Sequence, residues 1–92
     1  MTNDQMLLAA KATVMGYYKE RGKEDITAKD VYIVWFCKTL QNWKALASTD
    51  YHDGMYFEVT YDGDKNLIYF DAYHKEVNIS MEVEGNNSNE LE

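Results

Sequence analysis

The chain of 92 residues has no proline and only one cysteine, Cys37. Without proline, no loop is stiffened and no cis-proline delays folding. A single cysteine excludes an internal disulfide, which suits a reducing cytoplasm, so we expect a cytoplasmic protein. No apolar run approaches the length of a membrane span. We also expect no signal peptide, because no basic segment leads into an apolar one at the N-terminus.

Basic residues are scarce in the C-terminal half of the chain. The net charge is −7, and residues 50–92 hold eleven acidic residues against two basic ones, a local charge of −9. Residues 26–49 hold one acidic and three basic residues, a charge of +2. A phosphate backbone would be repelled by the C-terminal half, which argues against nucleic acid as the main partner.

Apolar residues are plentiful, at 46% of the chain, and 14% of the residues are aromatic. This is ample for one core in a chain of this length. We therefore expect a single globular domain over residues 1–84. The polar composition of residues 85–92 predicts a disordered tail, and its last two residues, Leu91-Glu92, are compatible with a remnant of a cloning site.

The N-terminal segment has the pattern of an amphipathic helix over residues 4–21. Thr2-Asn3-Asp4 supplies candidates for its N-cap, and Gly22 is a natural stop. Its apolar stripe, which should pack on a sheet, consists of Met6, Ala10, Val14 and Tyr17, widened by Leu7 and Tyr18.

The stretch Asp30–Thr49 reads as a hairpin of two strands, since its first half is almost wholly apolar, β-branched or aromatic. We place its turn at Gln41-Asn42, so that Lys38 opposes Ala45 and Phe36 opposes Ala47. The sequence then puts Cys37 on one face with Ile33, Trp35 and Leu46. Apolar side chains occupy both faces, so we expect both faces to be covered and Cys37 to be a small core residue.

Three further strands are expected from alternation of apolar and polar residues: 55–61, 67–73 and 77–83. The loop 62–66 joins the first two, with Phe57 opposite Phe70 and Val59 opposite Ile68. A turn at His74-Lys75-Glu76 leads into the last. The predicted fold class is α+β, with an N-terminal helix packed on an antiparallel meander sheet of about five strands.

Three segments carry a family resemblance: Asp30–Leu46, with the specific run Trp35-Phe-Cys-Lys-Thr-Leu-Gln-Asn-Trp-Lys44, then Asp53–Lys65 and Phe70–Lys75. Over residues 4–80 the chain resembles an uncharacterised family of small proteins from phages and prophages of Gram-positive bacteria. The resemblance implies a cytoplasmic protein made during phage growth or carried by a prophage, and it favours an accessory role. It brings no activity, ligand or catalytic residue.

Catalytic and metal-binding patterns are weak. Cys37 with His74 or His52 would pair a nucleophile with a base, but neither a helix N-terminus nor an electropositive cleft is indicated for the cysteine. The histidines, with Asp53 and Asp71, lack the spacing of metal ligands. Asp62-Gly63-Asp64 is a hairpin turn more readily than a calcium loop.

The facing carboxylates Glu58 and Asp71 would resemble a glycosidase pair only if a cleft were present, and no cleft is indicated. We therefore expect no enzymatic activity, no cofactor and no bound metal.

The aromatic residues give the leading functional hypothesis. One predicted sheet face gathers Tyr56, Tyr69 and Tyr73 with Glu58 and Asp71. Tyrosine is common in protein interfaces, so we expect a non-enzymatic interaction module whose acidic face binds a basic host or phage protein.

Four alternatives remain open. In the first, the tyrosines have a packing role alone, either beneath a second layer or with their rings down and their hydroxyls outward. A homodimer could cover one hairpin face. A small ligand or nucleotide could bind between Trp43 and the tyrosines. Single-stranded nucleic acid could stack on the aromatic face, although acidic neighbours disfavour it.

Overall fold

The computed structural model describes residues 1–83, so the tail expected at 85–92 lies outside the described residues. Its first element is the helix α1, Asn3–Glu20, close to the predicted 4–21. Thr2 caps it: the N–H of Gln5 donates to Oγ1 of Thr2 over 3.1 Å, and the N–H of Thr2 donates to Oε1 of Gln5 over 2.7 Å. This reciprocal capping box satisfies two backbone donors at the helix start.

The buried stripe of α1 runs through Met6, Ala10, Val14 and Tyr18. The sequence pattern chose Tyr17 as its last member, but Tyr17 is only half-buried. Steps of four residues drift around a helix axis, so such a stripe follows a neighbour that crosses the helix at an angle. That neighbour is the sheet.

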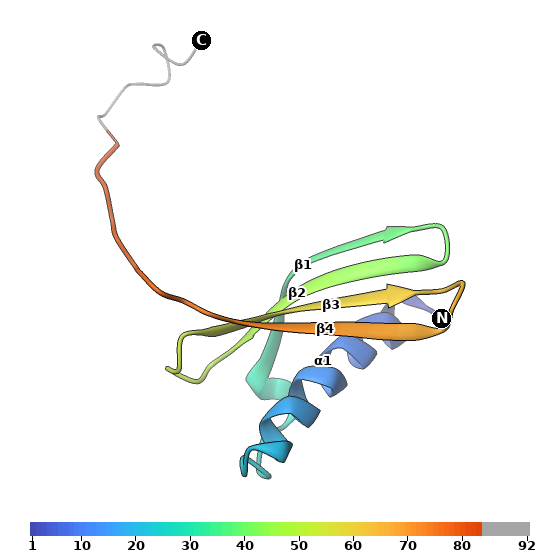
Figure 1. Cartoon of the computed structure of the whole chain (residues 1–92), viewed down its shortest axis with the longest axis horizontal. Helices are drawn as coiled ribbons and strands as arrows, with labels where there is room; N and C mark the ends of the chain where they lie inside the picture. The colour runs from blue at the N-terminus through green and yellow to red at the C-terminus, as the bar shows by residue number, and fades with distance from the viewer. Residues whose placement is uncertain (84–92) are drawn as a thin grey trace.

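After a short 3₁₀ turn, η1 (Ala28–Asp30), four antiparallel strands follow in the order β1-β2-β3-β4. They are β1 Val31–Thr39, β2 Asn42–Thr49, β3 Met55–Asp62 and β4 Leu67–His74. The α+β class and the meander are confirmed, with four strands in place of about five. Figure 1 shows α1 on one side of the sheet and the chain running away from the domain after β4.

The predicted strand over 77–83 is wrong. This segment pairs with no strand among the described residues, and its apolar side chains are 58–84% exposed. The expected turn at His74-Lys75-Glu76 does not form. Instead the N–H of Lys75 donates to the carbonyl of Gly54 over 2.6 Å, so the chain continues in line with β4. No residue from 74 to 76 has the positive φ that a two-residue hairpin turn requires.

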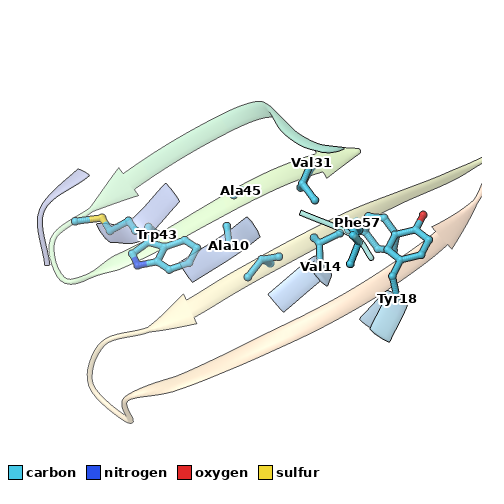
Figure 2. Close-up of a cluster of buried hydrophobic side chains, with 11 residues drawn as sticks. Ala10, Val14, Tyr18, Val31, Trp43, Ala45 and Phe57 are labelled. Carbon is cyan, nitrogen blue, oxygen red and sulfur yellow. The ribbon is translucent and has the colours of Figure 1, made fainter. Parts of the chain in front are cut away.

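The core lies between α1 and one face of the sheet (Figure 2). Ala10 and Val14 of the helix and Ala45 and Ala47 of β2 are fully buried, and such small residues let the helix lie close to the strands. Phe57 of β3 is the largest fully buried side chain. Burying a side chain of this size stabilises the fold by about 1.5–3 kcal/mol.

The turn between β1 and β2 lies at Leu40-Gln41, where Leu40 has a φ of 55°, and not at Gln41-Asn42. Lys38 therefore opposes Trp43, and Phe36 opposes Ala45, a shift of two residues from the predicted pairing. The side chain of Asn42 is used elsewhere: its Oδ1 accepts a 2.8 Å hydrogen bond from the N–H of Gly63, which joins this turn to the one between β3 and β4.

A β-bulge between Ile33 and Trp35 corrects two further expectations. It turns Ile33 toward the helix side, opposite Ala47, and leaves Val34 exposed. Trp35 and Cys37 remain on the other face, which no element of the described chain covers, so Cys37 is exposed and not a core residue. The pairing of β3 with β4 also differs by two residues from prediction, since Phe57 opposes Ala72 and Val59 opposes Phe70.

Candidate interaction surface

The sheet face that points away from α1 is uncovered in residues 1–83, and we call it the open face. Burial along β2 fixes its members, because Trp43, Ala45, Ala47 and Thr49 are buried on the helix side. Successive side chains of a strand alternate between faces, and paired residues share a face. The open face therefore contains Tyr32, Trp35, Cys37, Lys44, Leu46, Ser48, Tyr56, Glu58, Thr60, Leu67, Tyr69, Asp71 and Tyr73.

Five of the six expected site residues meet on the open face. Tyr56 opposes Tyr73 and Glu58 opposes Asp71, while Tyr69 follows on β4. The sixth, Trp43, is placed on the opposite face, where it is 3% exposed and packs between Phe36 and Tyr61 with ring centroids 6.0 and 5.6 Å away.

Tyr56 and Tyr73 form the central aromatic contact of the open face. Their rings are stacked, with centroids 4.9 Å apart and planes at 16°. Both residues stay accessible, at 43% and 41% exposure. A stacked, accessible pair offers a stiff apolar surface with hydroxyls for hydrogen bonding, which is the character of tyrosine in protein interfaces.

Next to this stack, two acidic side chains face each other. Like charges directly opposite on neighbouring strands repel. Nζ of Lys44 lies 3.5 Å from Oε2 of Glu58 and offsets part of that repulsion. Glu58 raises the pKa of Tyr73 above its usual range, with smaller contributions from desolvation, Asp71 and Tyr56. The potential at the tyrosine stack is thus negative, which favours a cationic group on a partner.

The sequence pattern did not single out the β1 side of the open face. Tyr32 and Trp35 are about half exposed there, beside Leu46 of β2. Both belong to the apolar run of β1, which suggested burial on both faces. The helix covers only one face, and the bulge in β1 turns Ile33 toward it while Tyr32 and Trp35 stay on the open face. The signal that could have found them is the mismatch between a run apolar on both faces and a single helix able to cover one.

A cleft of about 780 Å³ lies at one end of the open face. Strands β1 to β3 and the loop 50–54 contribute Tyr32, Leu46, Tyr51, His52 and Tyr56 to its lining, and Lys75, just beyond β4, also lines it. Its size matches a small-molecule site. Trp43, expected with the tyrosines in a ligand pocket, does not line it.

The loop 50–54 beside the cleft is anchored to the helix. The hydroxyl of Tyr18 donates a 2.6 Å hydrogen bond to Oδ2 of Asp53 and lies 3.4 Å from Oγ1 of Thr49. Burial, followed by the bond to Asp53, raises the pKa of Tyr18 to about 12. The phenol is therefore a fixed, neutral donor at ordinary pH and holds the loop in place.

The weakly indicated pair of Cys37 as nucleophile and His74 as base is not assembled. Cys37 opposes Lys44, in register with Thr60, whereas His74 opposes Met55 at the other end of β3. Five residues of strand separate these levels, about 17 Å. Within residues 1–83, no three His, Cys, Asp or Glu side chains are grouped to hold a metal ion. Asp62 Oδ1 accepts from the N–H groups of Asp64 and Lys65, which confirms a hairpin turn there.

These features define a small α+β protein, with one helix on one face of a four-stranded antiparallel meander and an aromatic, acidic surface on the other. The chain belongs to a family of unknown function, DUF6275, whose model matches residues 7–83. No curated protein and no solved structure matches it. In the part of the chain described, no helix is long and apolar enough to cross a membrane.

Proposed function

We propose that the protein is a non-enzymatic interaction module whose open face binds a basic surface of another protein. The observation that carries the proposal is the accessible Tyr56–Tyr73 stack directly beside the facing carboxylates of Glu58 and Asp71. An arginine or lysine of a partner fits such a place, because it can lie over an aromatic ring and pair with a carboxylate together.

The charge distribution supports a basic partner. The local charge of −9 over residues 50–92 would speed the encounter with a positively charged surface at low salt. The sequence resemblance to phage and prophage proteins of Gram-positive bacteria supports an accessory role in the cytoplasm of an infected or lysogenic host. In that setting the partner is a basic host or phage protein.

The test captures partners from host lysate with the tagged protein, with nuclease present and absent and at two salt concentrations. The critical variant is Tyr56→Ala with Glu58→Gln, which changes only β3, one of the two inner strands of the sheet. The matched control is Leu8→Ala with Glu20→Gln, which removes an exposed apolar side chain and one acid from α1.

We expect to capture a protein whose binding resists nuclease and is released by salt. The control variant should capture as much of it as the wild type, and the open-face variant at least about tenfold less. Equal capture by the variant and the control would reject the open face as the interface. Capture that nuclease abolishes would instead support the nucleic-acid alternative.

The cleft of about 780 Å³ favours a second candidate, a small-ligand binder such as a nucleotide binder. A ligand that binds only the folded protein raises its melting temperature, so thermal-shift screening can find it. Tyr32→Ala should abolish that shift because Tyr32 lines the cleft. A shift that persists in Tyr32→Ala would place the ligand elsewhere.

A further inference from the structure

Residues 77–83 are the one segment of the described chain with a strand pattern and no strand partner. Val77, Ile79, Met81 and Val83 alternate with polar residues and are all exposed. The alternation is in phase with β4, whose odd-numbered residues lie on the open face. Lys75, which joins the two segments, lines the cleft of that same face. Residues 67–83 thus read as one long strand, of which only the first half is paired.

The chain cannot easily use this second half itself. Folding it back onto β4 needs a tight turn near residues 75–76, and hairpin turns of two residues favour Gly, Asn or Asp with positive φ. Lys75-Glu76 offers none of these. The hydrogen bond from the N–H of Lys75 to Gly54 also directs the chain onward, past the end of the sheet (Figure 1). Among residues 1–83 no strand pairs with this segment, and the edge of a second copy can supply a partner for its first residues, 77–79.

The two edges of the sheet differ in their readiness to pair. The edge strand β1 is interrupted by its bulge between Ile33 and Trp35, a device that blocks pairing with other strands. The other edge, β4, pairs with β3 over eight consecutive residues without a bulge. Its outer side is free within residues 1–83, and α1 packs mainly against β1, β2 and β3. Regular, exposed edges of this kind join other strands.

We propose that β4 and its extension pair antiparallel with the same segment of a second copy, centred on Tyr73. In this register Tyr73 opposes Tyr73 of the second copy, and Asp71 opposes Lys75. Further out, Tyr69 opposes Val77 and Leu67 opposes Ile79. Aromatic, oppositely charged and aromatic–β-branched pairs are the cross-strand combinations that stabilise antiparallel sheets. The Tyr73–Tyr73 pair lies on the two-fold axis and every other pair occurs twice, once on each side of it. The interface is therefore closed and gives a dimer.

The charges favour this register over the one centred on Lys75, which also keeps the apolar residues on one face. A shift that moves Lys75 opposite Lys75 of the second copy would place like charges together, which is unfavourable. The proposed register instead forms two Asp71–Lys75 pairs. It also places the open faces of both copies on the same side of one continuous sheet, with the two Tyr56–Tyr73 stacks in a single row of four rings. The dimer is independent of the proposed function.

The first test is a charge swap in the full chain, read by sedimentation equilibrium. The wild type should have a mass in solution of twice the 10.7 kDa of one chain. Asp71→Lys and Lys75→Asp should each raise the dissociation constant of the dimer by at least about tenfold, and the double variant should return it to within about threefold of wild type. The two residues lie about 13 Å apart along one strand, so rescue reports contact between copies.

Matched controls carry the same charge changes away from β4: Glu20→Lys on α1 and Lys29→Asp on η1, both exposed. They should leave the dimer unchanged. A wild type that stays monomeric at several hundred micromolar overturns the proposal, and so does a dimer that the charge swap does not rescue.

The second test is disulfide trapping in a Cys37→Ser background. Directly opposed residues of antiparallel strands have Cα atoms about 4.5–5.5 Å apart, within the range of a disulfide. Oxidised Tyr73→Cys should therefore form a covalent dimer. Leu67→Cys lies on the same strand and face but far from the symmetry axis, so it should remain monomeric under denaturing, non-reducing conditions. Trapping at Leu67 and not at Tyr73 overturns the register.

Discussion

The hydroxyl of Tyr18 on α1 donates a 2.6 Å hydrogen bond to Oδ2 of Asp53 in the loop between β2 and β3. The two residues are 35 positions apart, and their contact ties the end of the helix to the loop that borders the cleft. Asp53 also accepts from the N–H of Met55 over 3.2 Å, so the loop is held at both the helix and the start of β3.

Tyr18→Phe should therefore destabilise the protein by about 1–2 kcal/mol at neutral pH, because it removes the bond and keeps the ring. The pKa of Tyr18 is raised from 10.0 to about 12, so the folded state holds the proton more tightly than the unfolded state. That contribution is complete below pH 10 and is lost as the pH rises toward 12. Urea unfolding of both proteins should show the difference narrowing over this window. A constant difference would contradict the assignment.

A second prediction concerns the electrostatics of the open face. Glu58 is the largest cause of the raised pKa of Tyr73, and Asp71 is a smaller one. Glu58→Gln should lower the pKa of Tyr73 toward 10.0 more than Asp71→Asn does, and added salt should reduce both effects. Titration of Tyr73 by NMR measures this directly. Asp64→Asn, in the turn before β4, is the control and should leave the titration unchanged.

The sequence predicts the sheet face of most strand residues correctly even where it predicts the strand register wrongly. From Trp35 to the turn of the first hairpin, and throughout the second, the observed register differs by two residues from the predicted one. Because the period of a strand is two, Phe57, Val59 and Ala45 still fall on the helix side. The open-face group of Tyr56, Glu58, Tyr69, Asp71 and Tyr73 was predictable for the same reason. Alternation alone decides faces.

What alternation could not decide is where it breaks or stops. The bulge beside Val34 changes the face of Ile33, and nothing in an unbroken apolar run marks its position. The turn lies at Leu40-Gln41 although leucine is disfavoured at positive φ, and contacts with the neighbouring turn hold this position. The side chain of Gln41 bonds to Asp64, and Asn42 accepts from Gly63. These contacts join segments more than 20 residues apart. Likewise, residues 77–83 have a strand pattern, but no strand within residues 1–83 pairs with them.

The contact between the two turns leads to a third prediction, with two glycines as a matched pair. A Cβ at Gly63 would collide with the backbone carbonyl of Gln41, so Gly63→Ala should destabilise the protein by about 1–3 kcal/mol. A Cβ at Gly16, inside α1, meets nothing within 4 Å. Gly16→Ala should stabilise by about 0.5–1 kcal/mol, since alanine favours a helix over glycine. Urea unfolding at one protein concentration measures both. Equal effects of the two substitutions would contradict the close approach of the turns.

The last prediction concerns the extension after β4. Removing residues 77–92 should leave the free energy of unfolding of the monomer unchanged within about 0.5 kcal/mol, since the apolar side chains of 77–83 are exposed and not in the core. As the reference for the loss of a core side chain, Phe57→Ala should lower the free energy of unfolding by about 3–5 kcal/mol, because Phe57 is fully buried. The comparison is made by urea unfolding at low micromolar concentration, where association contributes least. A loss above about 1 kcal/mol on truncation would mean that the segment packs on its own sheet, since an unpaired segment contributes to stability only through contacts that it makes. The same truncation should raise the dissociation constant of the dimer in sedimentation equilibrium, because it removes Val77 and Ile79, which oppose Tyr69 and Leu67 of the second copy.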